Sequence, residues 1–148
     1  MSFLIAHDTI DREAARRMLE APGCGACVLF EGWVRDHNEG RAVERLEYEV
    51  YEPLAIKEGN AIIAEARRRW AIGNALCIHR SGPLELTDLA VLVGVASAHR
   101  DEAFAAARFI IDEAKRRLPI WKKEFYSDGA VEWVNCRRCG HVHAEDAA

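Results

Sequence analysis

An apolar segment at residues 89–96 is followed closely by an amphipathic helical pattern at residues 100–118, and this pair restricts the folds open to the chain. The first segment is apolar at nearly every position, which is typical of a central strand buried on both faces. In the second, apolar side chains recur at spacings of three and four, so one helix face should pack on a core. These side chains are Phe104, Ala107, Ile111, Ala114 and Leu118. The pair predicts a domain in which helices cover a sheet.

The rest of the chain supplies more strands and two more helices. An apolar run at 26–34 and a period-two pattern at 43–51 predict two strands, which we expect to form a hairpin around a loop at 36–41. Thr9 is expected to cap the first helix, and a turn is expected at 81–83. Expected strands are 3–6, 26–34, 43–51, 75–79, 89–96, 120–126 and 131–134, and expected helices are 10–20, 53–70 and 100–118. This order predicts an α+β fold with helices on a largely antiparallel sheet.

Composition argues against several classes of protein. With 148 residues, 50% of them hydrophobic and 30% charged, the chain suits one folded domain. The 24 acidic residues outnumber the 20 Lys and Arg, which argues against a general nucleic-acid binder. No apolar run reaches membrane-spanning length, and the first residues lack a signal-peptide pattern. We therefore expect a cytoplasmic protein with reduced thiols.

Lysine is rare in this chain but clustered. Only four of the 20 basic residues are Lys, and Lys115, Lys122 and Lys123 lie within nine positions. Lys115 falls at a helix end and Lys122 just after the next turn, so their side chains can converge. Neighbouring cations favour a neutral amine, which acts as a base or a nucleophile. The alternative is a solvated, charged surface.

A second candidate site lies where the apolar strand gives way to the helix. A helix N-terminus offers free N–H groups, and His99 and Arg100 add donors that suit an anion. Asp101 and Glu102 compete with an anion for the same helix end. An ordinary helix cap is therefore the alternative interpretation.

Two more cationic segments border expected turns. Arg35 flanks a glycine-containing loop and can bind phosphate or carboxylate, although a plain loop explains the segment equally well. His79 and Arg80 end a strand in a similar way. The alternative for His79 is a partly buried ring whose nitrogen is satisfied locally.

The C-terminal residues differ in character from the domain before them. They contain Cys136, Cys139, His141 and His143, whose spacing fits half of a zinc site. These four are too close together for an easy tetrahedral site, whereas a second copy of the chain can complete one. A single Cys-x-x-Cys is a weak signal. Cys24, Cys27 and Cys77 are expected to be inert core thiols.

Five motifs occur in order along the chain. They are Phe30-Glu31-Gly32-x-Val34-Arg35-Asp36-His37-Asn38-x-Gly40, Leu46-Glu47-Tyr48-Glu49-x-Tyr51, His79-Arg80-x-Gly82, Ser97-Ala98-His99-Arg100-x-x-Ala103-Phe104 and Pro119-Ile120-Trp121-Lys122-Lys123-Glu124. In this register the chain resembles the MoaE family, the large catalytic subunits of molybdopterin synthase, over residues 25–134.

The resemblance implies a hammerhead-type α+β domain at residues 1–134 and a separate tail at 135–148. It implies a homodimer that forms a heterotetramer with two small ubiquitin-like subunits. Each small subunit would supply sulfur from a C-terminal Gly-Gly thiocarboxylate to cyclic pyranopterin monophosphate, giving molybdopterin. Lys115 and Lys122 match the catalytic lysines, and Arg35, His99 and Arg100 match the substrate pocket. No cofactor is required, and the tail has no counterpart that we associate with the family.

Three other functions compete with this one. The chain is a non-catalytic receptor for a ubiquitin-like tail if it has lost the chemistry. It is a persulfide sulfurtransferase if Cys27 or Cys77 carries the sulfur. It is a small zinc-ribbon-like interaction protein if the tail is the functional part. Intact Lys115 and Lys122 favour the sulfur-transferring enzyme subunit.

Overall fold

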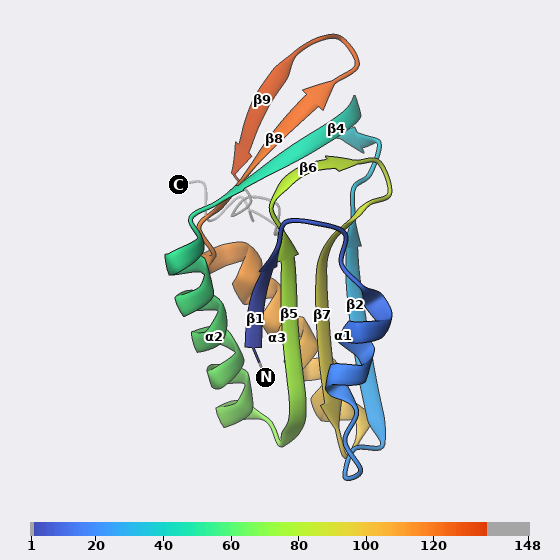
Figure 1. The fold of residues 1–148 in the computed structure, drawn as a ribbon, viewed down its shortest axis with the longest axis vertical. Helices are drawn as coiled ribbons and strands as arrows, with labels where there is room; N and C mark the ends of the chain where they lie inside the picture. Colours follow the sequence, from blue (N-terminus) through green and yellow to red (C-terminus); the bar gives the residue numbers. More distant parts are fainter. Residues whose placement is uncertain (1, 136–148) are drawn as a thin grey trace.

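A four-stranded sheet forms the body of the molecule, in the order β1-β5-β7-β2 (Figure 1). Its strands are β1 (Ser2–Ala6), β5 (Ile72–Arg80), β7 (Leu89–Ser97) and β2 (Ala26–Trp33). The computed structural model describes residues 2–135. Every residue of β7 is buried, as its apolar sequence predicts. β1 is parallel to β5, and the other two pairs are antiparallel.

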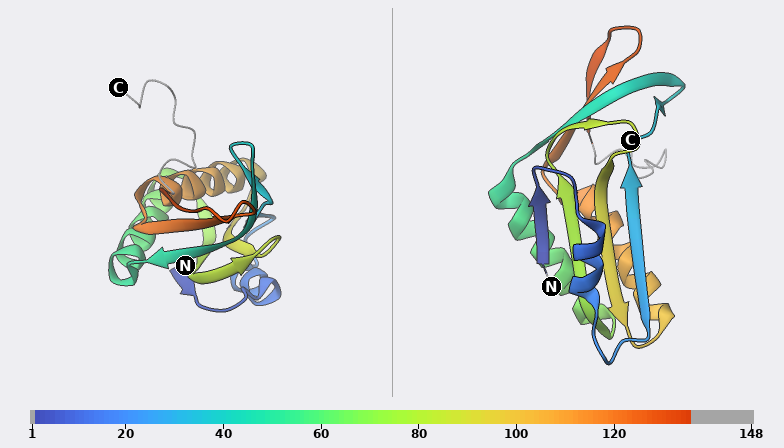
Figure 2. Two further views of the ribbon diagram at one scale, coloured as in Figure 1. Left: turned by 90° about the horizontal axis from the view of Figure 1, so that it is seen from above. Right: turned by 45° about the vertical axis from the view of Figure 1, so that its right-hand side comes forward.

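Helices cover both faces of this sheet (Figure 2). α1 (Arg12–Leu19) packs on one face, where Leu19 joins a cluster with Leu76 and Leu92. α2 (Glu52–Arg69) and α3 (Arg100–Arg117) pack on the other face and form the larger cluster. A side chain at Gly59 of α2 would collide with the ring of Phe3 on β1, so this glycine allows the helix to approach closely.

A second sheet stands at one end of the first, at the top of Figure 1. Its order is β3-β4-β8-β9, and β6 also pairs with β4. The strands are β3 (His37–Asn38), β4 (Arg41–Val50), β6 (Gly82–Glu85), β8 (Ile120–Tyr126) and β9 (Val131–Asn135). The polypeptide enters β8 directly from α3, with Leu118 and Pro119 between them. The expected α+β class, with helices packed on largely antiparallel sheets, is confirmed.

Four local predictions differ from the structure. β2 and β4 do not form a hairpin, because β2 pairs with β7 and β4 pairs with β6 and β8 in the other sheet. Asp11, not Thr9, caps α1, since its carboxylate accepts the backbone N–H of Ala14 at 3.0 Å. The expected turn at 81–83 and loop at 36–41 contain the short strands β6 and β3. Backbone pairing with β4 orders both segments, and a local pattern does not reveal such a partner.

The predicted zinc ligands Cys136, Cys139, His141 and His143 lie outside the described residues, so zinc binding by the tail stays a prediction. Within residues 2–135 there is no group of three or more His, Cys, Asp or Glu side chains arranged to hold a metal ion. In the same part of the chain, no helix has both the length and the apolar character needed to cross a membrane.

Candidate active site

Lys115 lies in the last turn of α3, beside a narrow cavity between this helix and the sheets. Seven side chains line the cavity: His79, Val91, Ile111, Ala114, Lys115, Leu118 and Ile120. Five of these are apolar, so the lysine stem packs against hydrocarbon. Among residues 2–135, no carboxylate lies within ion-pair distance of Lys115. Lys115 is therefore a half-buried amine without a fixed counter-charge in the described part of the chain.

Lys122 lies on β8 in a different environment. Its Nζ is 3.0 Å from Oε1 of Glu124, and the side chains of both residues are largely buried. The other oxygen of Glu124 accepts hydrogen bonds from Tyr126 at 2.6 Å and from Asn38 at 3.0 Å. Burial alone would raise the pKa of Glu124, but Tyr126, Lys122 and Asn38 together hold this pKa below its ordinary value. A charged carboxylate therefore accompanies Lys122.

Two aromatic side chains lie between the two lysines. Tyr48 of β4 lies directly opposite Lys122 of β8 in the strand register, so the two side chains share one face of the sheet. The Tyr48 ring meets the ring of His79 edge to face, with 4.8 Å between their centroids. His79 in turn lines the cavity beside Lys115. The row from Lys122 through Tyr48 and His79 to Lys115 places both predicted catalytic lysines at one end of the molecule.

Arg35 belongs to the same end. It follows β2, and its guanidinium donates to Oδ1 of Asn38 at 3.4 Å. Asn38 donates in turn to Glu124, the partner of Lys122. Arg35 is solvent-exposed, which leaves its remaining N–H groups open to an anion from solution. Asn38 and Glu124 thus link Arg35 to Lys122.

His99 and Arg100 lie at the opposite end of α3. His99 is the N-cap residue, its side chain makes no cap hydrogen bond, and both residues are exposed. Lys115 follows Arg100 by fifteen residues, which corresponds to about 22 Å along an α-helix. Within one copy of the chain, the structure does not bring the five predicted site residues into one pocket.

Sequence reasoning assigned no role to two contributors to the lysine environments. Glu124 had a visible signal, because period-two alternation places it on the same face of β8 as Lys122. Tyr48 had no local signal, since only the pairing of β4 with β8 and the contact with β5 bring it between the lysines. His79 carried no sign of its neighbour Lys115, which comes from another element.

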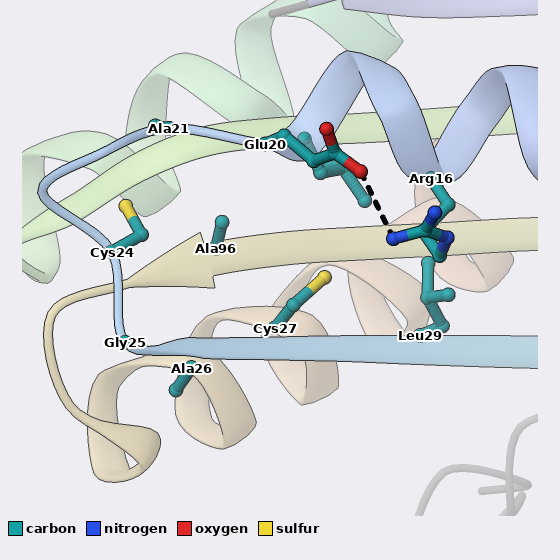
Figure 3. Close-up of a pocket in the computed structure, with 10 residues that line it drawn as sticks. Arg16, Glu20, Ala21, Cys24, Gly25, Ala26, Cys27, Leu29 and Ala96 are labelled. Atoms are coloured by element: carbon teal, nitrogen blue, oxygen red, sulfur yellow. Dashed lines mark hydrogen bonds and ion pairs between the residues drawn. The ribbon is translucent and has the colours of Figure 1, made fainter.

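A larger pocket lies elsewhere, where β2 begins (Figure 3). Arg16, Cys24 and Cys27 line it, and Arg16 pairs with Glu20 at 3.0 Å beside it. Cys27 is exposed, so the prediction of a core thiol was wrong for it, but partial burial still raises the pKa of its thiol, against a smaller lowering by Arg16. Burial also raises the pKa of Cys77 to about 12. Persulfide chemistry needs a thiolate, so neither environment favours the cysteine-based alternative.

Comparison with known proteins identifies the family of the chain. The family model described as MoaE protein matches residues 5–117. A molybdopterin synthase catalytic subunit from Staphylococcus carnosus is 42% identical over 142 residues, covering 96% of this chain and 94% of the relative. One from Yersinia pestis is 46% identical over 121 residues, covering 82% of this chain and 80% of the relative.

Solved structures show the same likeness. Molybdopterin synthase from Staphylococcus aureus superposes with a TM-score of 0.82 at 36% identity, covering 90% of this chain and 95% of that one. The molybdopterin biosynthesis MoaE protein from Burkholderia ambifaria gives a TM-score of 0.78 at 36% identity, covering 93% and 91%. A complex of subunits 1 and 2 of molybdopterin-converting factor from Helicobacter pylori shares the fold, with a TM-score of 0.73 at 19% identity over 94% of this chain and 92% of that one. Sequence and fold agree, and the chain belongs to the MoaE family.

Proposed function

We propose that this chain is the catalytic subunit of a cytoplasmic molybdopterin synthase. It takes sulfur from the C-terminal thiocarboxylate of a small ubiquitin-like subunit and transfers it to cyclic pyranopterin monophosphate, forming the dithiolene of molybdopterin. The supporting observation is the pair of lysines at one end of a MoaE-family fold, one beside a carboxylate and one beside an apolar cavity. Both substrates are anions, which suits a site built from cations.

Lys122 acts in this proposal as a fixed cation. The carboxylate of Glu124 stabilises the ammonium form and orients it, at 3.0 Å. A charged donor held in place binds the thiocarboxylate or the substrate phosphate without having to reorganise during the reaction. Arg35, which is linked to the same carboxylate through Asn38, adds a second donor at this end.

Lys115 acts as the amine that takes part in the chemistry. No carboxylate among residues 2–135 forms an ion pair with it, and the cavity beside it is mostly apolar. An amine in such a place can transfer protons as sulfur moves, or accept the acyl group of the partner's C-terminus. The sulfur arrives on the partner, so no cysteine of this chain is needed.

A second copy of the chain brings His99 and Arg100 into the site. β2 is an end strand of the four-stranded sheet, and exposed apolar side chains lie on it and nearby, on Leu29, Phe30, Trp33 and Phe104. β2 begins beside the start of α3, since Ala26 pairs with Ser97, and it ends near Arg35. Two β2 strands packed antiparallel about a twofold axis therefore place His99 and Arg100 of one copy near the lysines of the other.

The partner is proposed from the chemistry and from a structural neighbour. The Helicobacter pylori protein is a complex of two different subunits of molybdopterin-converting factor. We infer an equivalent small subunit for this chain, with its C-terminus directed toward Lys115 and Lys122. Two such subunits on one homodimer give a heterotetramer.

Reconstituted turnover tests the proposal. The chain is mixed with a thiocarboxylated small subunit and cyclic pyranopterin monophosphate, and molybdopterin is followed as its fluorescent oxidised derivative. Product is expected from wild type and from Lys123→Ala, whose lysine lies on the other face of β8, near Trp133. Much less product is expected from Lys122→Ala. A folded wild type that binds the partner but forms no product would support the receptor alternative instead.

A further inference from the structure

His79 is a buried titratable side chain to which the proposed function has so far given no role. It lies near the end of β5 and is 7% exposed. Its Nδ1 is 2.7 Å from the carbonyl oxygen of Arg80, and its ring rests against the ring of Tyr48. A carbonyl oxygen only accepts hydrogen bonds, so Nδ1 carries the hydrogen. In a neutral ring, Nε2 is then left with its lone pair.

The surroundings keep this ring neutral at physiological pH. Burial lowers the pKa of His79 to about 4, the hydrogen bond to Arg80 opposes this effect, and the positive charge of Lys115 adds to it. The ring thus presents an uncharged acceptor throughout the neutral range. A protonated histidine in the same position would repel the neighbouring ammonium.

Lys115 is the other polar side chain at the cavity that His79 lines, and its charge is close enough to act on the ring. His79 and Lys115 are the two polar side chains among the seven that line the cavity. The other packed elements contribute Val91 from β7 and Ile120 from β8, which have no polar side-chain atoms. From β4 the titratable neighbour is Tyr48, with Lys122 and its partner Glu124 beyond it. On β5 itself, the titratable group two residues earlier is the buried thiol of Cys77.

We propose that His79 is a positioning residue for Lys115, whose terminal nitrogen it holds at the cavity through a hydrogen bond accepted by Nε2. The inference rests on the proposed function, because it concerns the amine that function uses. A lysine side chain has four flexible bonds, and fixing its end near the reacting carbon removes much of the entropic barrier. A neutral acceptor fixes the position of the Lys115 nitrogen without placing a negative charge beside it, unlike Glu124 beside Lys122.

Three substitutions separate this role from simple packing. His79→Phe keeps the ring and its edge contact with Tyr48 but has no acceptor. His79→Asn keeps a donor for the Arg80 carbonyl but does not reach the Nε2 position. His79→Gln places an amide oxygen close to the Nε2 position. In reconstituted turnover we expect kcat to fall 10- to 100-fold for Phe and Asn and at most about threefold for Gln, with KM for the small subunit unchanged in all three.

A second measurement needs neither partner nor substrate. Nitrogen-15 NMR of the histidine rings in wild type should show Nδ1 protonated and Nε2 accepting a hydrogen bond. In Lys115→Met the Nε2 signal should move toward that of a free lone pair, and the pKa of His79 should rise as the lysine charge is lost. Lys57→Met, which removes an exposed lysine on α2, should leave the His79 signals unchanged.

The outcomes distinguish the positioning role of His79 from the proposed function of the chain. Unchanged His79 signals in Lys115→Met, or equal activity of the Asn and Gln variants, would overturn the positioning role even in an active enzyme. An Nε2 signal that responds to Lys115 in a protein that forms no molybdopterin would support the contact and contradict the proposed function instead.

Discussion

Lys115 and Lys122 are seven residues apart and lie at the same end of the molecule, but their environments differ. Lys122 is paired with a buried carboxylate that three neighbouring groups hold in its charged form. Lys115 lies beside apolar side chains and a neutral histidine. The same side chain thus lies beside a fixed carboxylate in one place and beside a mostly apolar cavity in the other. This difference is the basis on which we propose anion binding for Lys122 and the reactive amine for Lys115.

The largest expected effect is on turnover. Lys115→Ala should reduce molybdopterin formation by at least about 100-fold, because it removes the reacting amine. Lys123→Ala should stay within about twofold of wild type, since that lysine is on the outer face of β8 near Phe125 and Trp133. Steady-state assays with saturating small subunit compare the two. Equal losses would show that any lysine in this segment serves the reaction through charge alone.

The free energy of unfolding should depend more on Lys122 than on Lys115. Lys122→Met leaves the Glu124 carboxylate buried without its cation, which should lower the free energy of unfolding by about 3 kcal/mol. Lys115→Met removes no ion pair among residues 2–135 and should change it by less than about 1 kcal/mol. Urea unfolding at neutral pH measures both values. A similar loss in the two variants would contradict the contrast between their environments.

Acid should destabilise the fold through His79. Its folded pKa of about 4 lies below its unfolded pKa of 6.5, so between these values the unfolded chain binds more protons. Stability is therefore lost as the pH falls, by about 2 kcal/mol between neutral pH and pH 5 from this residue. His79→Gln should show a loss smaller by that amount in urea unfolding at the two pH values. Identical pH dependence in wild type and variant would mean that His79 titrates normally.

The separation of Arg100 and Lys115 at opposite ends of α3 leads to a prediction with a smaller expected effect. Arg100→Ala should raise KM for the pterin about tenfold with little change in kcat, as expected for a lost charge-assisted contact with an anion. Mixed dimers of Arg100→Ala and Lys115→Ala chains should then recover activity at low substrate, because one of their two sites has both residues. Failure of mixing to raise activity above the separate variants would place Arg100 outside the partner's site.

The elements with strong local patterns were predictable from the sequence. The buried strand β7, the amphipathic helix α3 and the β8–β9 hairpin follow from periodicity and from a turn where Gly129 adopts a positive φ. The division into two sheets was not predictable, because the partners of β2 and β4 come from distant segments. The candidate site was likewise predictable only in part. The lysines and Arg35 stood out in the sequence as residue types. The contact between His79 and Tyr48 depends on packing, and the distance from Lys115 to Arg100 depends on the length of α3.

A single-turnover experiment tests the division of roles most directly. Wild type, Lys115→Met and Lys122→Met are each mixed with thiocarboxylated small subunit and cyclic pyranopterin monophosphate, and mass spectrometry follows the loss of sulfur from the small subunit. The structure predicts that Lys115→Met binds the small subunit normally and leaves its thiocarboxylate intact. It predicts that Lys122→Met binds more weakly but still consumes the thiocarboxylate slowly. Consumption at the wild-type rate by Lys115→Met would contradict the assignment of the reactive amine.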